Sequence, residues 1–97
     1  MEQYELTIIA PEELTVVDKI KLEKLIKRYG RLTKRIVEGV KNLCYAINGR
    51  EKGLYLYYEL EMETPKPSEL SEVLGRQDNA IRYLLVQADN RSNGSAR

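Results

Sequence analysis

Hydrophobic and polar positions alternate most clearly in the stretch GLYLYYELEM, residues 53–62. Successive side chains of a strand point to opposite faces, so this alternation predicts a strand with two distinct faces. One face carries only large apolar side chains, at Leu54, Leu56, Tyr58, Leu60 and Met62. The opposite face carries two tyrosines and two glutamates, at Tyr55, Tyr57, Glu59 and Glu61. The first face is expected to meet a core, and the second needs a reason for its tyrosines.

Periodicity along the rest of the chain predicts five further elements. Alternation indicates strands over residues 4–10, 32–47 and 81–86, and apolar residues three and four apart indicate helices over about 15–29 and 67–74. Gly30 and Gly75 follow the two helices and are expected to end them, Gly30 in the left-handed conformation. Gly39 interrupts the second strand and predicts a bulge or bend there. The segment NGREKG, residues 48–53, is expected to be the turn of a hairpin.

The predicted order, β-α-β-β-α-β, is that of the ferredoxin-like split βαβ arrangement. Right-handed crossovers place both helices on one side of a four-stranded antiparallel sheet, which makes an α+β fold with one uncovered sheet face. We expect that open face to carry Ile9, Tyr55, Tyr57, Arg82, Leu84 and Val86. A face this apolar is a candidate contact surface. The alternative is that these side chains only pack across strands, as on many antiparallel sheets.

The length of 97 residues predicts one domain, which we place over residues 1–88, followed by a flexible polar tail over 89–97. Cys44 is the only cysteine, so no internal disulfide can form, and we expect it to be a buried or half-buried filler. Apolar runs are too short to cross a membrane, and Glu2 and Glu5 stand where a signal peptide would be positively charged. We therefore expect a cytoplasmic protein.

Charge is distributed unevenly although the net charge is only +1. Five basic residues and Glu38 alone lie within residues 31–50, whereas residues 51–80 hold seven acidic residues and three basic ones. A basic segment next to an acidic one is a hint of a polyanionic partner on one side of the molecule. Solvated surface charge is the alternative.

The residue types present give little support for a catalytic function. The chain has no histidine, which removes the commonest general base and metal ligand. Glu59, Glu61 and Glu63 share one strand face, where solvated charge is a simpler explanation than a cation site. An acylphosphatase has this fold, but it needs a phosphate-binding loop after its first strand, and here that loop is the acidic APEELT. We expect no enzyme activity, no cofactor, no metal and no small-molecule substrate.

The RNA-recognition motif also uses this fold, and KGLYLYYE, residues 52–59, superficially matches its third strand. The motif's first and third aromatic positions, however, fall on Leu54 and Leu56. A shift of one residue turns every side chain of a strand to the other face. We therefore do not expect Tyr55 and Tyr57 to stack on bases.

Four stretches of the chain together resemble a known family. YELTII resembles its first strand, and YGRLTKRIVEGVKNLCYAI resembles its helix end and second strand. KGLYLYYELEM resembles the third strand, and SELSEVLGRQDNAIRYLLV resembles the second helix, the turn after it and the last strand. From about residue 3 to residue 87, the chain is similar to the ribosomal protein S6 family of the bacterial small subunit.

This resemblance implies a structural role in the ribosome without catalysis. Proteins of the family pair with ribosomal protein S18, and the pair binds the central domain of the small-subunit rRNA during assembly. The resemblance and the expected facing then suggest RNA contacts at Arg35, Lys41, Arg50, Lys52 and Arg82. Contacts with the partner protein are suggested at Ile9, Tyr55, Tyr57, Leu84 and Val86. Two alternatives stay open, namely a ferredoxin-like interaction module without RNA, such as a homodimer through the open sheet, and a redesigned scaffold of the family.

Overall fold

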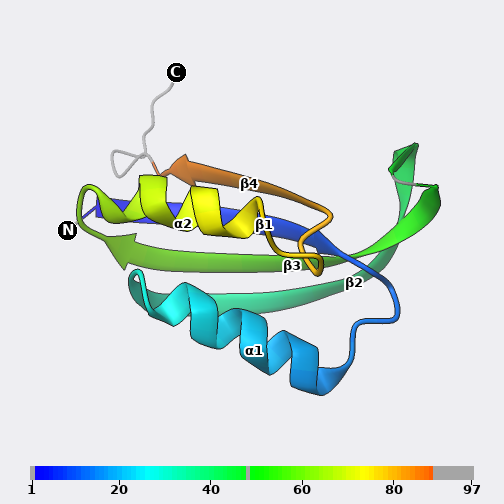
Figure 1. The fold of residues 1–97 in the computed structure, drawn as a ribbon, viewed down its shortest axis with the longest axis horizontal. Coiled ribbons are helices and arrows are strands. Elements are labelled where there is room, and N and C mark those ends of the chain that lie inside the picture. The colour runs from blue at the N-terminus through cyan, green and yellow to red at the C-terminus, as the bar shows by residue number, and fades with distance from the viewer. Residues whose placement is uncertain (1, 48, 89–97) are drawn as a thin grey trace.

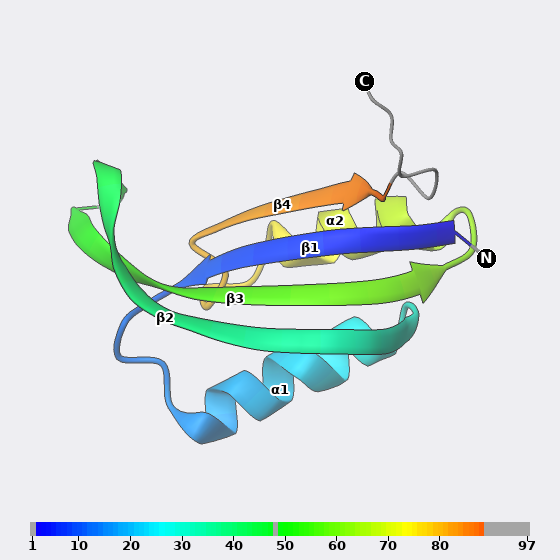
Figure 2. The same ribbon diagram turned by 180° about the vertical axis from the view of Figure 1, so that it is seen from behind.

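The computed structural model of the chain describes residues 2–47 and 49–88, so the tail predicted over 89–97 lies outside the described residues. The elements are, in chain order, β1 (Glu2–Ala10), α1 (Val16–Lys27), β2 (Arg31–Ile47), β3 (Arg50–Met62), α2 (Lys66–Leu74) and β4 (Arg82–Gln87). The strands form one antiparallel sheet in the order β2-β3-β1-β4, and both helices lie on one side of it (Figure 1). Seen from behind, the strands lie in front of the helices and no helix covers them (Figure 2). The predicted fold is confirmed.

The core lies between the sheet and the helices and follows the predicted alternation of β3. Leu56, Tyr58, Leu60 and Met62 are buried, and Leu54 packs partly buried against them. Strand β1 adds Leu6, Ile8 and Ala10, and the helices add Leu22, Ile26, Leu70 and Leu74. Burial of these side chains against one another is the main favourable contribution to folding, at about 1.5–3 kcal/mol for each large aliphatic side chain.

The ends of the helices follow the sequence only in part. The Thr15 hydroxyl accepts a hydrogen bond from the Asp18 backbone N–H at 3.1 Å, which caps the start of α1 as Ser and Thr commonly do. Gly30 is not left-handed, because among the described glycines only Gly39 and Gly49 have positive φ. Instead, a Cβ at Gly30 would collide with the Glu61 carbonyl oxygen and the Met62 side chain. Glycine is therefore needed there for a close approach of two chain segments, and the predicted conformation was wrong.

Strand β2 lies at one edge of the sheet, is irregular, and is longer than its neighbour β3. Its pairing with β3 shifts register between Leu32 and Lys34 and again between Val37 and Gly39, where Gly39 has a φ of +100°. The predicted bulge at Gly39 is confirmed. Ile47 pairs with Arg50, so the connection is shorter than the predicted turn over 48–53. Beyond the end of β1, the distal parts of β2 and β3 continue as a twisted hairpin (Figure 2).

Candidate functional site

The open sheet face carries a patch of aromatic and aliphatic side chains, ordered by the strand register. Antiparallel pairing aligns side chains of neighbouring strands in rows across the sheet. One row consists of Gly39, Tyr55, Ile9 and Arg82, from β2 to β4. The next row consists of Ile36, Tyr57, Thr7 and Leu84. Leu84 is 62% exposed and the tyrosines are half-buried, so the structure brings four of the five predicted partner residues together.

Next to this patch, toward the C-terminal end of β3, the open face is acidic. The third row places Glu5 directly opposite Glu59, with Val86, the fifth predicted partner residue, on one flank and Lys34 on the other. Like charges directly opposite each other destabilise a sheet. The Tyr57 hydroxyl donates to the Glu59 carboxylate at 2.9 Å. Partial burial and this hydrogen bond raise the pKa of Tyr57 to about 12, so its phenol stays a neutral donor at physiological pH.

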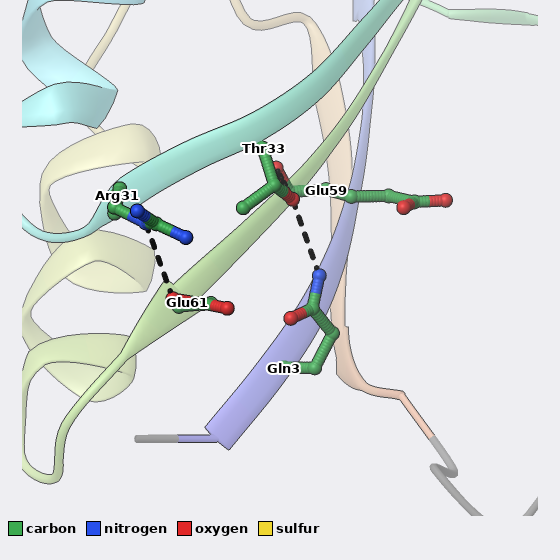
Figure 3. Close-up of polar contacts among 5 residues, drawn as sticks. All are labelled: Gln3, Arg31, Thr33, Glu59 and Glu61. Atoms are coloured by element: carbon green, nitrogen blue, oxygen red, sulfur yellow. Dashed lines mark hydrogen bonds and ion pairs between the residues drawn. The ribbon is translucent and has the colours of Figure 1, made fainter.

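Polar contacts tie the acidic end of the face together (Figure 3). The Gln3 amide Nε2 donates to the Thr33 hydroxyl at 3.2 Å, and that hydroxyl donates to the Glu59 backbone carbonyl at 3.0 Å. These two bonds connect β1 with β2 across the intervening β3. Nearby, Arg31 Nε lies 3.3 Å from Glu61 Oε1. These contacts hold the side chains at the acidic end of the open face in place. The exposed ion pair by itself contributes little to stability.

A pocket of about 190 Å³ lies at the other end of the open face, under the distal hairpin. Ile9, Tyr55 and Arg82 form its base, and residues 43–47 of β2 form its wall. Gly53 permits this arrangement, because a Cβ there would lie 2.5 Å from Ile9 Cγ2. Cys44 in the wall is exposed, so its prediction as a buried filler was wrong.

The predicted RNA residues do not form one cluster. Lys41 Nζ lies 3.2 Å from Glu38 Oε1 and 5.1 Å from the centre of the Tyr55 ring. Arg50 pairs with Glu13 at 2.9 Å, and this hydrogen bond lowers the pKa of the Glu13 carboxyl. Lys52 is exposed in the hairpin and Arg82 is exposed at the start of β4. Four of the five residues therefore surround the hairpin and the pocket.

Arg35 lies on the opposite, helix-covered side of the sheet. Its Nη1 donates to the Glu23 carboxylate of α1 at 2.7 Å, and the two side chains are 61% and 12% exposed. The pair therefore links α1 to strand β2. Beneath it lies the buried Tyr58 phenol, whose pKa is raised by burial and by the nearby charge of Glu23.

We expect Arg35→Met to lower the free energy of unfolding by about 1 kcal/mol. It leaves the poorly solvated Glu23 carboxylate without its charged partner, and the exposure of Arg35 keeps the loss well below that of a fully buried pair. Urea denaturation measures the change. Lys34→Met is the matched control, since Lys34 is exposed and makes no ion pair within the described part of the chain. Equal effects of the two substitutions would contradict a structural role for Arg35.

The structure also reveals a basic surface that the sequence reasoning overlooked. Residues 19–35 hold eight basic residues and a single acidic one, Glu23. Four of them lie on α1, and Lys21, Lys24 and the C-cap residue Arg28 are exposed along one side. The helical spacing of these three residues, at i, i+3 and i+7, was a signal present in the sequence. The same spacing occurs on the polar face of any amphipathic helix, so by itself it does not identify a binding surface.

Residues 2–47 and 49–88 contain no group of three or more His, Cys, Asp or Glu side chains placed to hold a metal ion. No helix among the same residues is long and apolar enough to cross a membrane.

Comparison with known proteins decides the family. The sequence model of the family described as "Ribosomal protein S6" matches residues 3–87. The chain belongs to the ribosomal protein S6 family. Membership confirms the resemblance in the sequence and the predicted class, a small-subunit ribosomal protein of the cytoplasmic ribosome.

Relatives within the S6 family match over nearly their full length. The small ribosomal subunit protein bS6 of Corynebacterium efficiens is 37% identical over 95 residues, which cover 92% of this chain and 99% of that one. The bS6 protein of Thermus thermophilus is 26% identical over 93 residues, covering 91% and 92%. The crystal structure of 30S ribosomal protein S6 from Thermotoga maritima matches with a TM-score of 0.80 at 17% identity, covering 95% of this chain and 92% of that one. That structure supports the fold.

Proposed function

We propose that this chain is a structural, non-catalytic component of the small ribosomal subunit that binds the central domain of the rRNA together with ribosomal protein S18. The observation that carries the proposal is the separation of charge around the sheet. The open face is apolar with an acidic end, whereas four basic side chains surround the hairpin at its other end, where Glu38 and Glu13 pair with two of them. A surface of the first kind suits a protein, and one of the second kind suits phosphate.

The open face is the proposed contact with S18, through Ile9, Tyr55, Tyr57, Leu84 and Val86. Half-buried tyrosines with exposed aliphatic neighbours offer a large apolar area at little entropic cost, as interface hot spots do. The opposed carboxylates of Glu5 and Glu59 repel each other in the free protein. A basic side chain from a partner would relieve that repulsion, and a nucleic-acid backbone would increase it. This is why a basic protein fits the face better than RNA does.

The hairpin is the proposed contact with rRNA, through Lys41, Arg50, Lys52 and Arg82. Lys and Arg side chains contact phosphate oxygens and thereby fix position and orientation without reading sequence. Arg35 was also predicted to bind RNA, but it lies on the helix-covered side of the sheet, away from the hairpin, where it pairs with Glu23 of α1. We assign it the structural role and leave it out of the proposed RNA contact.

A titration of the rRNA central-domain fragment with the chain, with and without purified S18, tests the proposal. At 200 mM salt we expect binding only when S18 is present, and with S18 the binding should weaken as salt is raised from 50 to 200 mM. Absence of binding under both conditions, with the protein folded by circular dichroism, would refute the proposal. If the chain instead sediments as a dimer that is lost on substitution of Leu84, the homodimer through the open sheet is the better explanation.

We expect Lys41→Ala with Arg82→Ala to reduce the salt dependence of this rRNA binding. Each lost phosphate contact lowers the slope of log K against log salt by about 0.7–0.9, so the slope should fall by roughly 1.5. Lys27→Ala with Lys66→Ala removes the same charge beside Met62, at the end of β3 opposite the hairpin, and serves as the control. An unchanged slope in the first variant would show that neither Lys41 nor Arg82 meets phosphate.

A further inference from the structure

A cleft of about 340 Å³ lies between α1 and the loop that joins α2 to β4. It is on the helical side of the molecule, away from the open sheet face that the proposed function uses. Its lining residues are Asp18, Lys21, Leu22, Lys24, Leu25, Arg28, Gln77 and Asn79. Leu22 is buried and Leu25 is half-buried, so the floor is apolar and the rim is polar.

We propose that this cleft is a second phosphate-backbone site, which binds RNA on the helical side of the protein. Three of its lining side chains are cationic and two are amides, and all five can donate hydrogen bonds. Lys, Arg, Asn and Gln are among the side chains that contact phosphate oxygens in nucleic-acid complexes. The inference rests on the proposed function only for the class of partner, since a ribosomal protein is surrounded by RNA.

The three cations are available to a ligand. Lys21, Lys24 and Arg28 are exposed and form no ion pair with any residue in the described part of the chain. Seven helical residues rise about 10 Å, so the three charges form a short line along the cleft. Such a line follows a linear polyanion better than it fits a compact anion.

Other polar groups at the cleft restrict where phosphate can bind. Asp18 lines one end and would repel phosphate there, and Asp78 is exposed between the two amide residues without lining the cleft. Gln77 Nε2 already donates to the Val73 carbonyl oxygen at 3.5 Å, which leaves one amide hydrogen for a ligand. The net charge of the lining residues is still positive, from three cations and one carboxylate.

Binding of the full chain to a 16-base-pair RNA duplex of arbitrary sequence, followed by fluorescence anisotropy at 50–200 mM salt, tests the inference. We expect Lys21→Gln, Lys24→Gln and Arg28→Gln combined to weaken binding at least tenfold at 50 mM salt and to lower the salt slope by about two to three. Glutamine keeps the helix propensity of these exposed positions, so the fold should survive. The same duplex should protect Lys21 and Lys24 from acetylation.

The control variant combines Lys19→Gln, Lys27→Gln and Arg76→Gln, which removes three positive charges from the same side without touching the cleft lining. Equal weakening by the two variants, or no binding by the unaltered chain at 50 mM salt, would overturn the inference. Poly-glutamate that protects the two lysines where the duplex does not would identify an acidic protein as the partner and also overturn it. Hairpin variants that abolish rRNA binding with S18 while duplex binding persists would separate the two sites.

Discussion

Tyr55→Ser combined with Tyr57→Ser should weaken binding of the chain to S18 by about 100-fold, or roughly 2–3 kcal/mol. The two tyrosines occupy the middle of the open face, each between an apolar or neutral neighbour on β1 and a residue of β2. Aromatic side chains at the centre of an interface commonly contribute 1–2 kcal/mol or more each. Isothermal titration calorimetry with purified S18 measures the loss directly.

The same double variant should lose less in folding than in binding. The tyrosine side chains point away from the core, and cross-strand contacts of this kind contribute about 0.2–1 kcal/mol each. Val16→Ser with Val17→Ser is the matched control, because these valines of α1 are 68% and 60% exposed and lie on the helical side. Unaltered affinity in the tyrosine variant, or an equal loss in the valine variant, would exclude the open face as the docking surface.

The sequence predicted the open face well because β3 alternates without interruption. Nine consecutive residue pairs join β1 and β3 in a single register, so the facing of Tyr55 and Tyr57 carries over to Ile9 on the next strand. In β2, the facing of a side chain cannot be inferred from a continuous register in this way. Three shifts of register interrupt the alternation, and because the first lies between Leu32 and Lys34, the facing of Arg35 cannot be read from its neighbours in the chain. Its pairing with Glu23 emerged only when α1 was placed beside it.

The cleft on the helical side was beyond sequence reasoning for a different reason. Its two walls, Lys21 to Arg28 on α1 and its C-cap, and Gln77 to Asn79 after α2, are about fifty residues apart in the chain. Only the packing of both helices on one side of the sheet brings them together. Periodicity reports which side of a helix is polar, and it does not report what lies opposite.

Gly30→Ala should lower the free energy of unfolding by about 2–3 kcal/mol. A glycine after a helix is usually explained by a left-handed backbone conformation. Gly30, however, does not have a positive φ. Its missing side chain is needed because a Cβ would collide with the Glu61 carbonyl oxygen and the Met62 side chain, at the end of β3. A backbone atom cannot move aside without disturbing the pairing of Arg31 with Glu61, so the cost is that of overpacking.

Gly75→Ala is the matched control because Gly75 also lies at the end of a helix, as the C-cap of α2, with a φ of −63°. A Cβ there would meet the Glu72 carbonyl oxygen at 3.5 Å, which is ordinary van der Waals contact. Alanine in a compatible conformation restricts the unfolded chain, so this substitution should raise stability by about 0.5 kcal/mol. The thermal and urea midpoints of unfolding should therefore fall for the Gly30 variant and rise for the Gly75 variant. Equal small losses at the two positions would mean that Gly30 tolerates a side chain, and that the close contact between the start of β2 and the end of β3 does not require glycine.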